Sequence, residues 1–563
     1  MVRIGLPLGV FFAFFWHSTA ASSLYQDDAA CVGEFRTPFR TIPASVAQWI
    51  EQRFPKPQVA GSIPAGGANF SIHFDHSMDS VHERISSVVP RTTLHSVGSR
   101  FSRLMWSSRE RRGPAMSESN QSRQPKHINH QLGPMSCPVN LDDVDLFGAG
   151  AQEHWYEMYE ILHREAPVLR IAGGGLRPGS DAFVLTKHSD IAMVVKDPDR
   201  FTVMGQRRVN EWANQGMTVE EAYETSRNLM TASMVSLRPT QAMYITHRKE
   251  LTDPWVGTGA HRHREMIARV ANELVDEWIA DGEVEFISRF ARPLPQRVFA
   301  TILGFPFEDI PMLAAWGDAI VMPFVHGTGL KHELDPDQAA DMYRRLEGFQ
   351  DYIYEHVRAK RLDPRDDMVS FLCGVHYEAL DRKLTDLEIA GIVHAMIIGA
   401  LETTQYALEE QAQLLCENAG LFDILRNDHG KVRAFTEESL RLRSPTHGLS
   451  TRMTSRDEVF QGVHVPAGSL LHLRFGAANV DAEEFSCPHE LDLERDGLTR
   501  HLAFSAGPRV CPGANLSRIE QQVAWNVLLD RLSSIEYGDG NDWRHQPGIM
   551  LGTLKLNLRF ATA

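Results

Sequence analysis

The stretch "FSAGPRVCPGANLSRIE", Phe504–Glu520, places a single cysteine between two glycines on a loop that leads into a helical pattern. Gly507 and Gly513 permit a tight turn and close backbone approach, and Pro512 suits the first position of a helix. The free N–H groups at the start of that helix would face the sulfur of Cys511 and stabilise its negative charge. Because the thiolate is the form of cysteine that binds metals and attacks substrates, the stretch indicates a metal ligand or a nucleophile, with a buried structural cysteine as the alternative.

The composition of the chain sets broad limits on its function. Its 563 residues, of which 43% are hydrophobic, can bury a large core and exceed the usual length of one domain. A net charge of -15 argues against nucleic acid as a partner. The six cysteines are scattered without a CxxC pair, so we expect neither a disulfide framework nor a zinc site, and we expect a reduced, cytoplasmic protein.

The first 115 residues differ in character from the rest. "MVRIGLPLGVFFAFFW" resembles the start of a secretory signal peptide, and its apolar run is too short to span a bilayer. "SVAQWIEQRFPKPQVAGSIPAGGA", residues 45–68, resembles the peptide obtained when a transfer-RNA gene is read as protein. We expect residues 1–115 to be a non-native leader, with synthesis beginning at Met116 or Met135 and a flexible segment over 116–140. The alternative is a disordered leader behind a signal peptide.

From about residue 140 the chain shows helical and extended patterns that do not alternate one by one, which disfavours a doubly wound sheet. The sum is a mainly α fold with a minor β region. The patterns are a helix and then a strand in 154–171, a strand and then a short helix in 181–202, two amphipathic helices in 263–306, an apolar helix over 387–416, a helix in 431–445, short strands in 457–475, a helix over about 512–532 and a hairpin in 548–560.

The cysteine stretch resembles a known family. Phe504, Gly507, Arg509, Cys511 and Gly513 match the pattern F-x-x-G-x-R-x-C-x-G, which is the haem-ligand loop of the cytochrome P450 family. The resemblance implies that Cys511 is the axial ligand of a haem b iron, that Phe504 covers the sulfur and that Arg509 contacts a haem propionate.

A second motif lies within the apolar helical pattern. In "GALETT", Gly399–Thr404, an acid stands next to a hydroxyl in otherwise apolar surroundings, which is unfavourable unless the pair is used or faces solvent. The stretch resembles the oxygen-activation motif of the family, with Ala400 at a position where glycine is common. The resemblance implies that Thr403 hydrogen-bonds the activated oxygen and that Glu402 helps to relay protons.

A third motif lies between the other two in sequence. In "ESLR", Glu438 and Arg441 form an i,i+3 pair that would ordinarily be a weak surface pair. The stretch resembles the ExxR motif of the family, and Arg495 in "LDLERDG" fits its third member. The implied role of this triad is to fix the loop that carries the cysteine.

Further positions are assigned from the same resemblance. "HRHR" at 261–264 is interpreted as a solvated basic face rather than a metal cluster. His447 is interpreted either as a hydrogen-bond partner of the substrate or as a satisfied loop histidine. The implied propionate contacts are Arg452, His501, Arg509 and, in "YITHR", Arg248 and Tyr244, where Tyr244 replaces the usual His or Trp. The implied substrate-wall residues are Ile398, Gly399, Thr446, His447 and Leu449.

The resemblance extends from about residue 140 to the end of the chain, so residues 141–563 are expected to form the haem domain with the cytochrome P450 fold. It implies a monooxygenase that inserts one oxygen atom of O2 into a C–H or C=C bond of a small apolar substrate. Electrons from NAD(P)H would arrive through a separate ferredoxin and ferredoxin reductase, with no membrane span. The alternatives are a peroxide-dependent peroxygenase of the same fold, a non-catalytic haem-binding or gas-sensing protein, and a cysteine hydrolase.

Overall fold

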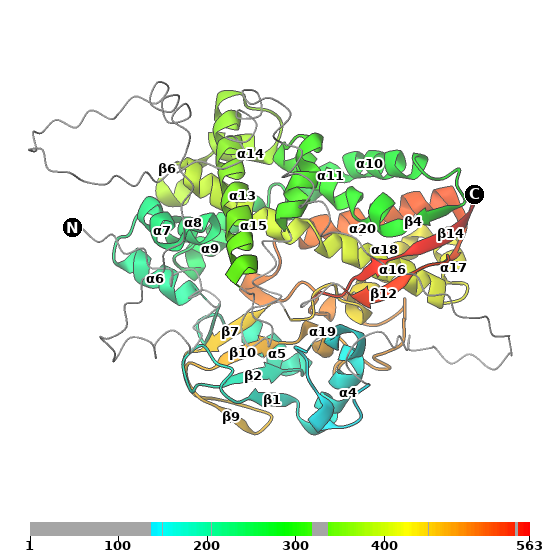
Figure 1. Ribbon diagram of the computed structural model, residues 1–563, viewed down its shortest axis with the longest axis horizontal. Coiled ribbons are helices and arrows are strands. Elements are labelled where there is room, and N and C mark those ends of the chain that lie inside the picture. The colour runs from blue at the N-terminus through cyan, green and yellow to red at the C-terminus, as the bar shows by residue number, and fades with distance from the viewer. Residues whose placement is uncertain (1–136, 149, 204, 318–335, 449, 546–549) are drawn as a thin grey trace, which may run out of the picture. The chain divides into compact units, whose positions relative to one another are not determined.

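The computed structural model describes residues 137–563 except 149, 204, 318–335, 449 and 546–549 (Figure 1). The leader expected at 1–115 and most of the segment 116–140 therefore lie outside the described residues. The helices are α4 (Trp155–Glu165), α5 (His188–Lys196), α6 (Gln206–Asn214), α7 (Val219–Ser226), α8 (Leu229–Leu237), α9 (Gln241–His247), α10 (Arg264–Asp276), α11 (Pro293–Leu303), α13 (Pro336–Leu362), α14 (Met368–Gly374), α15 (Asp386–Ala400), α16 (Thr403–Glu417), α17 (Leu421–Asn427), α18 (Val432–Leu442), α19 (Phe475–Ala478) and α20 (Ala514–Arg531).

The strands are short and belong to several small sheets. They are β1 (Val168–Ile171), β2 (Ala182–Leu185), β3 (Phe201–Val203), β4 (Glu283–Glu285), β5 (His376–Tyr377), β6 (Arg382–Lys383), β7 (Thr451–Thr454), β8 (Glu458–Phe460), β9 (Val463–Val465), β10 (Leu470–Leu473), β11 (Leu532–Tyr537), β12 (Asp542–His545), β13 (Thr553–Lys555) and β14 (Asn557–Thr562).

The largest sheet has five strands in the order β1-β2-β10-β7-β3, and only the β2–β10 pair is parallel. Both β2 and β10 are buried along their whole length, which explains why their sequences are mostly apolar instead of alternating, with His472 as the one polar residue of the two strands. One core cluster joins Phe183 and Leu471 of these strands to Val194 of α5, and another joins Val184 to Trp155 of α4. The sheet is therefore covered by helices on both faces (Figure 1).

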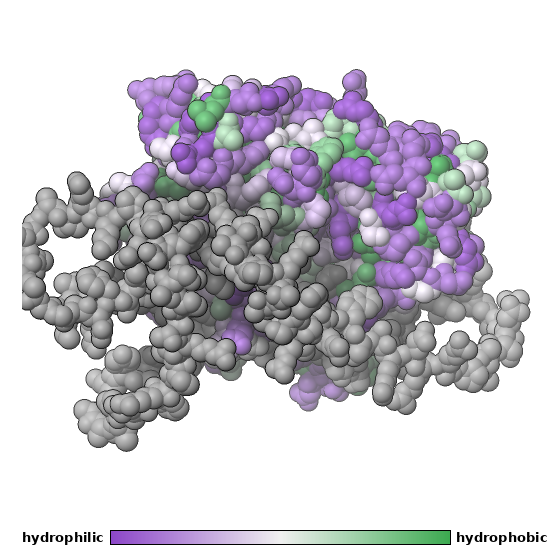
Figure 2. Space-filling model, turned by 45° about the horizontal axis from the view of Figure 1, so that its top comes forward, coloured by the Kyte–Doolittle hydropathy of each residue, from purple (hydrophilic) through white to green (hydrophobic). Residues whose placement is uncertain are grey.

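The main core of the described residues is helical and surrounds α15, which packs against α8, α11, α13, α14 and α16. A Cβ at Gly391 would lie 2.3 Å from Ser233 Oγ, so this glycine lets α15 approach α8 closely. Several large apolar side chains from distant segments, among them Phe349 and Trp525, belong to this single cluster. On the face in Figure 2, the described residues are mainly hydrophilic, with hydrophobic residues in small groups between them.

The helix and strand patterns of the sequence are confirmed in most places, and two of them need correction. The apolar helix expected over 387–416 is two helices, because α15 ends at Ala400 and α16 begins at Thr403. The hairpin expected in 548–560 is wrong, because β13 pairs with β12 whereas β14 lies between β11 and β4. The alternation there does mark strands, but β13 pairs with β12, the strand just before it, and β14 pairs with β11 and with the distant β4.

One helical stretch among the described residues, Asp386–Glu417, could cross a membrane by length and composition alone. However, 56% of its most apolar window is buried inside the protein, as in the core helix of a globular domain. Its apolar character is therefore explained by packing within the protein.

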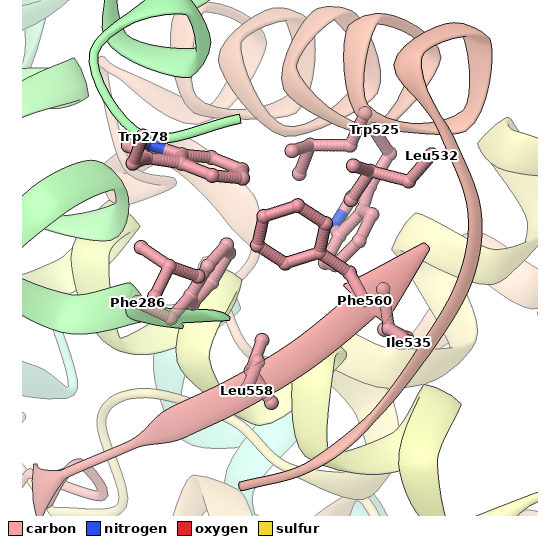
Figure 3. Close-up of a pocket in the computed structure, with 9 residues that line it drawn as sticks. Trp278, Phe286, Trp525, Leu532, Ile535, Leu558 and Phe560 are labelled. Atoms are coloured by element: carbon pink, nitrogen blue, oxygen red, sulfur yellow. The ribbon is translucent and has the colours of Figure 1, made fainter. Parts of the chain in front are cut away.

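A small apolar cavity lies between α20 and the β11–β14–β4 sheet (Figure 3). Its volume of about 10 Å³ is close to that of one water molecule, and its walls offer no polar surface to hold one. Trp525 lies eleven residues after the start of α20, roughly 16 Å along the helix from its cysteine end. This cavity is therefore a local packing gap of the core and not a substrate site.

Candidate active site

The three residues assigned to the ExxR triad meet in one buried group. Arg441 donates to both carboxylate oxygens of Glu438, at 2.9 and 2.7 Å, and Arg495 Nε donates to Glu438 Oε1 at 2.8 Å. Neither Arg441 nor Glu438 is exposed. Both guanidinium groups also donate to the carbonyl oxygen of Glu490, at 3.0 Å each, so the triad binds the backbone of the segment that leads to the cysteine loop.

The cysteine loop is held by its own backbone and by α5. The N–H of Cys511 donates to the carbonyl oxygen of Phe504 at 2.9 Å, which closes the loop around the short turn Gly507–Arg509. Gly507 has φ +69°, and a Cβ there would lie 2.8 Å from the carbonyl oxygen of Val195. Both the backbone conformation and the close approach to α5 therefore require glycine.

The helix after the cysteine begins later than the sequence indicated. Gly513 is the N-cap and Ala514 the first residue of α20, so Pro512 precedes the cap and is not the first helical residue. The correction leaves the electrostatic argument intact, because the N–H groups of Gly513 and Ala514 both donate toward the sulfur of Cys511.

The surroundings of the Cys511 sulfur have opposing effects on its ionisation to a thiolate. Burial raises the pKa of the Cys511 thiol above its ordinary value, while the two backbone N–H groups and the guanidinium groups of Arg248 and Arg518 act in the opposite direction. A metal ion bound to the sulfur would complete the ionisation, because a coordinating thiol loses its proton. The donor set therefore fits a metal-bound thiolate better than a free nucleophile.

Near this loop lie one buried arginine, Arg452, and two half-buried ones, Arg238 and Arg509, and Arg509 is within electrostatic range of the other two. Burial lowers the pKa of each, that of Arg452 to about 10, and Arg509 adds repulsion to both Arg238 and Arg452. No carboxylate among the described residues pairs with them. Buried charges are ordinarily paired, so the cluster requires an anionic group that the described chain does not supply.

Other polar groups in this region also lack some of their hydrogen-bond partners. Arg509 donates to the side-chain oxygens of Gln241 and Gln206 at 2.9 and 3.2 Å. Arg238 Nε, Gln241 Nε2 and His247 Nδ1 are buried without a hydrogen-bond partner among the described residues. The two carboxylates of a haem would satisfy both the charges and these donors, so the residues present fit this cofactor.

Two assigned propionate contacts have other partners in the structure. His501 Nε2 lies 3.0 Å from Glu437 Oε2, and the N–H of Ala503 donates to its Nδ1, so both ring nitrogens are already engaged. Arg248 donates to the carbonyl oxygen of Val510 at 2.6 Å and lies 3.6 Å from Asp253. The assignment of these two side chains to propionates is therefore corrected: each holds protein groups around the cysteine loop.

Tyr244 and Phe504 both pack against arginines. The guanidinium of Arg509 lies 4.1 Å from the ring centre of Tyr244, and that of Arg518 lies 4.5 Å from the ring centre of Phe504. Arg518 also forms a two-pronged ion pair with Glu437. Four residues of this region were missed from sequence: Arg238, Gln206, Gln241 and His247. No motif marks the first three, and from "YITHR", which contains His247, Tyr244 and Arg248 were assigned instead.

The acid and the alcohol of "GALETT" lie at the break between α15 and α16. Thr403 Oγ1 donates to the carbonyl oxygen of Gly399 at 2.9 Å, and Glu402 is the N-cap residue of α16. Gly399 is exposed, and a Cβ there would meet no described atom within 4 Å. The break therefore borders open space and presents a hydroxyl at its edge.

The assigned substrate-wall residues do not all lie together. Ile398 and Gly399 are at least partly exposed on α15, and Thr446 is buried, with its Oγ1 3.4 Å from Met550 Sδ. Leu449 lies outside the described residues. His447 is buried between Trp155 and Tyr159, with its Nδ1 2.9 Å from the Tyr159 hydroxyl and its ring stacked on Trp155 at 4.7 Å. These contacts favour a packed loop histidine over a substrate contact for His447, although its Nε2 is buried without a hydrogen-bond partner among the described residues.

The comparisons with known proteins agree with this site. The family model of cytochrome P450 matches residues 430–560, which include the ExxR triad and the cysteine loop. The chain is 30% identical over 403 residues to cytochrome P450 105C1 of Streptomyces sp, covering 70% of this chain and 91% of that protein. It is 31% identical over 303 residues to cyclomarin C epoxidase of Salinispora arenicola, covering 54% and 74%. The structure matches that of P450BioI with a TM-score of 0.61 and 25% identity, over 73% of this chain and 99% of that one.

These comparisons confirm the expected fold, mainly α with a minor β region, and the reaction class. The similar proteins come from bacteria and include, besides the epoxidase, the 6-deoxyerythronolide B hydroxylase of Saccharopolyspora erythraea, which is 26% identical over 399 residues. Hydroxylation and epoxidation are both oxygen insertions. The chain therefore belongs to the cytochrome P450 family and is a haem-dependent monooxygenase.

Proposed function

We propose that this enzyme inserts one oxygen atom of O2 into a C–H or C=C bond of a small apolar organic molecule, with electrons from separate redox partners. The observation that carries the proposal is the contact between Thr404 Oγ1 and Ser517 Oγ, at 3.0 Å. It joins the first turn of α16, next to the acid–alcohol pair Glu402–Thr403, to the first turn of the helix that follows Cys511. The residues proposed for oxygen activation and for metal ligation thus lie at the starts of two helices that are in direct contact.

In this proposal Cys511 would bind the iron of haem b through its thiolate. Arg238, Arg452, Arg509 and His247 would hold the propionates, since none of them has an acidic partner among the described residues. Haem bound through a thiolate supplies the cleavage of the O–O bond and the transfer of oxygen to the substrate. The Glu438–Arg441–Arg495 triad fixes the backbone ahead of the loop, and Gly507 and Gly513 provide its close contacts and its helix cap.

The chain's own part in the reaction is to position the substrate and to move protons. Thr403 holds its hydroxyl at the edge of the helix break, where its oxygen can accept a hydrogen bond from a ligand beside Gly399 while its O–H donates to the Gly399 carbonyl oxygen. Glu402, at the first position of the break, would pass protons toward that hydroxyl. Ile398, Gly399, Thr446 and Leu449 are proposed to border an apolar substrate, in keeping with the names of the epoxidase and hydroxylase relatives.

The proposed electron donors are a ferredoxin and an NAD(P)H-dependent ferredoxin reductase, and the proposed location is the cytoplasm. All five cysteines among the described residues are free thiols, which is the usual state in a reducing compartment. Arg248 is unsuited to contact a redox partner, because its guanidinium is largely buried and bound to the loop backbone.

The test is the absorption spectrum of the reduced, carbon-monoxide-bound full chain beside a Cys511→Ala copy. A strongly red-shifted Soret band that disappears in the variant would support thiolate ligation, and its absence from the wild type would refute it. Turnover is then compared between a ferredoxin system and hydrogen peroxide. Product formed only with peroxide would favour the peroxygenase, and haem binding without any turnover would favour a non-catalytic haem protein.

A further inference from the structure

A cysteine, a histidine and a carboxylate meet where the described chain enters its first α-helix. Cys137 Sγ, a ring nitrogen of His154 and a carboxylate oxygen of Glu157 all lie within 4.8 Å of one another. His154 immediately precedes α4, and Glu157 lies three residues later on the same side of its first turn. Cys137 comes from the extended segment ahead of this helix, so the group joins two separate parts of the chain.

These three donors suit one class of metal ion. A thiolate sulfur, an imidazole nitrogen and a carboxylate oxygen are the ligands that zinc takes in proteins, whereas calcium and magnesium take oxygen ligands. Three protein ligands would leave a fourth position for water, and Cys137 is exposed, so a metal ion can reach the group from solvent.

The charges that the group can carry also suit a cation. Once Cys137 is a thiolate, its sulfur and the Glu157 carboxylate lie close enough to repel each other, and a divalent ion between them would convert this repulsion into attraction. Zinc binding would displace the thiol proton to solvent, so that about one proton is released for each ion bound.

We propose that Cys137, His154 and Glu157 bind a zinc ion, separate from the haem site. The scattered cysteines led us to expect no zinc site, and this proposal replaces that expectation. The three ligands have the spacing C-x16-H-x2-E, which lacks the paired cysteines or histidines of the usual zinc motifs, and only the fold brings them together.

The consequence of zinc binding is structural. The segment between the ligands includes the short helical turn Leu141–Asp143, capped by Asn140, and the carbonyl oxygen of Leu146, to which Trp155 Nε1 donates at 3.2 Å. A metal bridge from Cys137 to α4 would close this segment into a loop against Trp155, which itself stacks on His447. The ion would thus hold the segment around Cys137 against α4, next to the five-stranded sheet.

The experiment uses the haem-loaded enzyme. The wild type and the variants Cys137→Ser, Glu157→Gln and Cys487→Ser are dialysed against zinc, freed of loose metal, and analysed for zinc and haem by mass spectrometry. Cys487 is the matched control because it is also an exposed free cysteine. X-ray absorption at the zinc edge reports whether a sulfur lies at about 2.3 Å from the metal. The haem spectrum of each variant shows that it is folded.

We expect about one zinc per haem in the wild type and in Cys487→Ser, with one sulfur ligand, and loss of that zinc in both Cys137→Ser and Glu157→Gln. Equal zinc in wild type and Cys137→Ser, or a zinc shell without sulfur, would overturn the proposal, as would the absence of bound zinc from the wild type. If Cys137→Ser did not fold, Glu157→Gln would serve in its place: loss of zinc would support the proposal, and zinc equal to that of the wild type would overturn it. None of these outcomes depends on monooxygenase activity.

Discussion

The hydroxyl oxygens of Thr404 and Ser517 lie 3.0 Å apart and join α16 to α20. The contact continues inward as a chain of side-chain hydrogen bonds. Gln521 Nε2 donates to Ser517 Oγ at 3.0 Å, and Gln411 Nε2 donates to Gln521 Oε1 at 2.6 Å. Trp525 Nε1 then donates to Gln411 Oε1 at 2.6 Å. A buried network that is fully connected fixes the relative position of the helices that share it.

Replacing Ser517 by Ala is therefore expected to destabilise the protein by about 1 kcal/mol, because Thr404 and Gln521 both lose a buried partner. Urea unfolding would measure the change. A double-mutant cycle with Thr404→Val isolates the hydroxyl–hydroxyl contact, and the two changes should be coupled. Strictly additive effects would show that the contact contributes nothing to stability.

Thr403, one residue earlier, is expected to act on chemistry rather than on stability. Thr403→Val removes the hydroxyl at the helix break while keeping the shape of the side chain. Haem content should stay unchanged, whereas more of the NAD(P)H consumed should appear as hydrogen peroxide and less as oxygenated product. Thr403→Ser, which keeps the hydroxyl, is the matched control and should retain most of the coupling. An unchanged product yield in Thr403→Val would remove Thr403 from the proposed proton path.

The positions found from sequence are those whose spacing is local. The loop around Cys511 and the pair Glu438–Arg441 each occupy a few consecutive residues, so a motif could mark them, and the structure places them in buried contact with the expected partners. Arg495 was found because its motif precedes the cysteine loop at a short distance. The break in the apolar helix at Glu402 was not predicted, since both flanking segments keep the same apolar pattern.

The residues missed from sequence are those whose role depends on distant neighbours. Arg238 carries no motif, and its significance lies in being half-buried near Arg509 without an acidic partner among the described residues. His447 is the opposite case. Its position suggested substrate contact, but the aromatic rings of α4, almost three hundred residues away in sequence, enclose it. Pairing of β14 with the remote strand β4 is likewise invisible in a local alternation.

Breaking the ExxR triad should be severe. Arg441→Leu leaves Glu438 buried with only part of its compensation, and loss of one partner of a buried ion pair costs about 3–5 kcal/mol. We expect a fall of this size in the free energy of unfolding and poor incorporation of haem. Glu211→Gln, which breaks the exposed pair with Arg207 on α6, is the control and should change neither quantity measurably. Normal haem content in Arg441→Leu would show that the triad does not hold the loop.

Removing Arg238 should affect the protein in opposite directions with and without haem. In the apoprotein, Arg238→Met removes a half-buried charge that has no acidic partner among the described residues, so the free energy of unfolding should rise by about 1 kcal/mol. With haem, the same change removes a proposed propionate partner, so haem should dissociate faster to an apoglobin acceptor. Arg227→Met, which alters an exposed arginine, is the control for both measurements. A lower stability of the apoprotein variant would contradict the interpretation of the arginine cluster.

Acid sensitivity should come in part from His394 on α15. Burial lowers the pKa of this imidazole to about 3, its ring meets Phe349 edge-on at 5.1 Å, and its Nδ1 has no hydrogen-bond partner among the described residues. In the unfolded chain a histidine takes up its proton near pH 6.5, so between pH 6.5 and 3 the unfolded state binds more protons than the folded state. The folded state is therefore favoured above pH 6.5 and loses about 1.4 kcal/mol for each pH unit below it.

His394→Leu removes this titration, and the difference between wild type and variant should change with pH accordingly. Between pH 7.5 and pH 5, the free energy of unfolding of the wild type should fall by about 2 kcal/mol more than that of His394→Leu, because the variant has no imidazole to protonate on unfolding. Urea unfolding at both pH values measures the two slopes. His464→Leu, at an exposed histidine on β9, is the matched control. Parallel slopes in wild type and His394→Leu would mean that His394 is protonated in the folded protein as readily as in the unfolded chain.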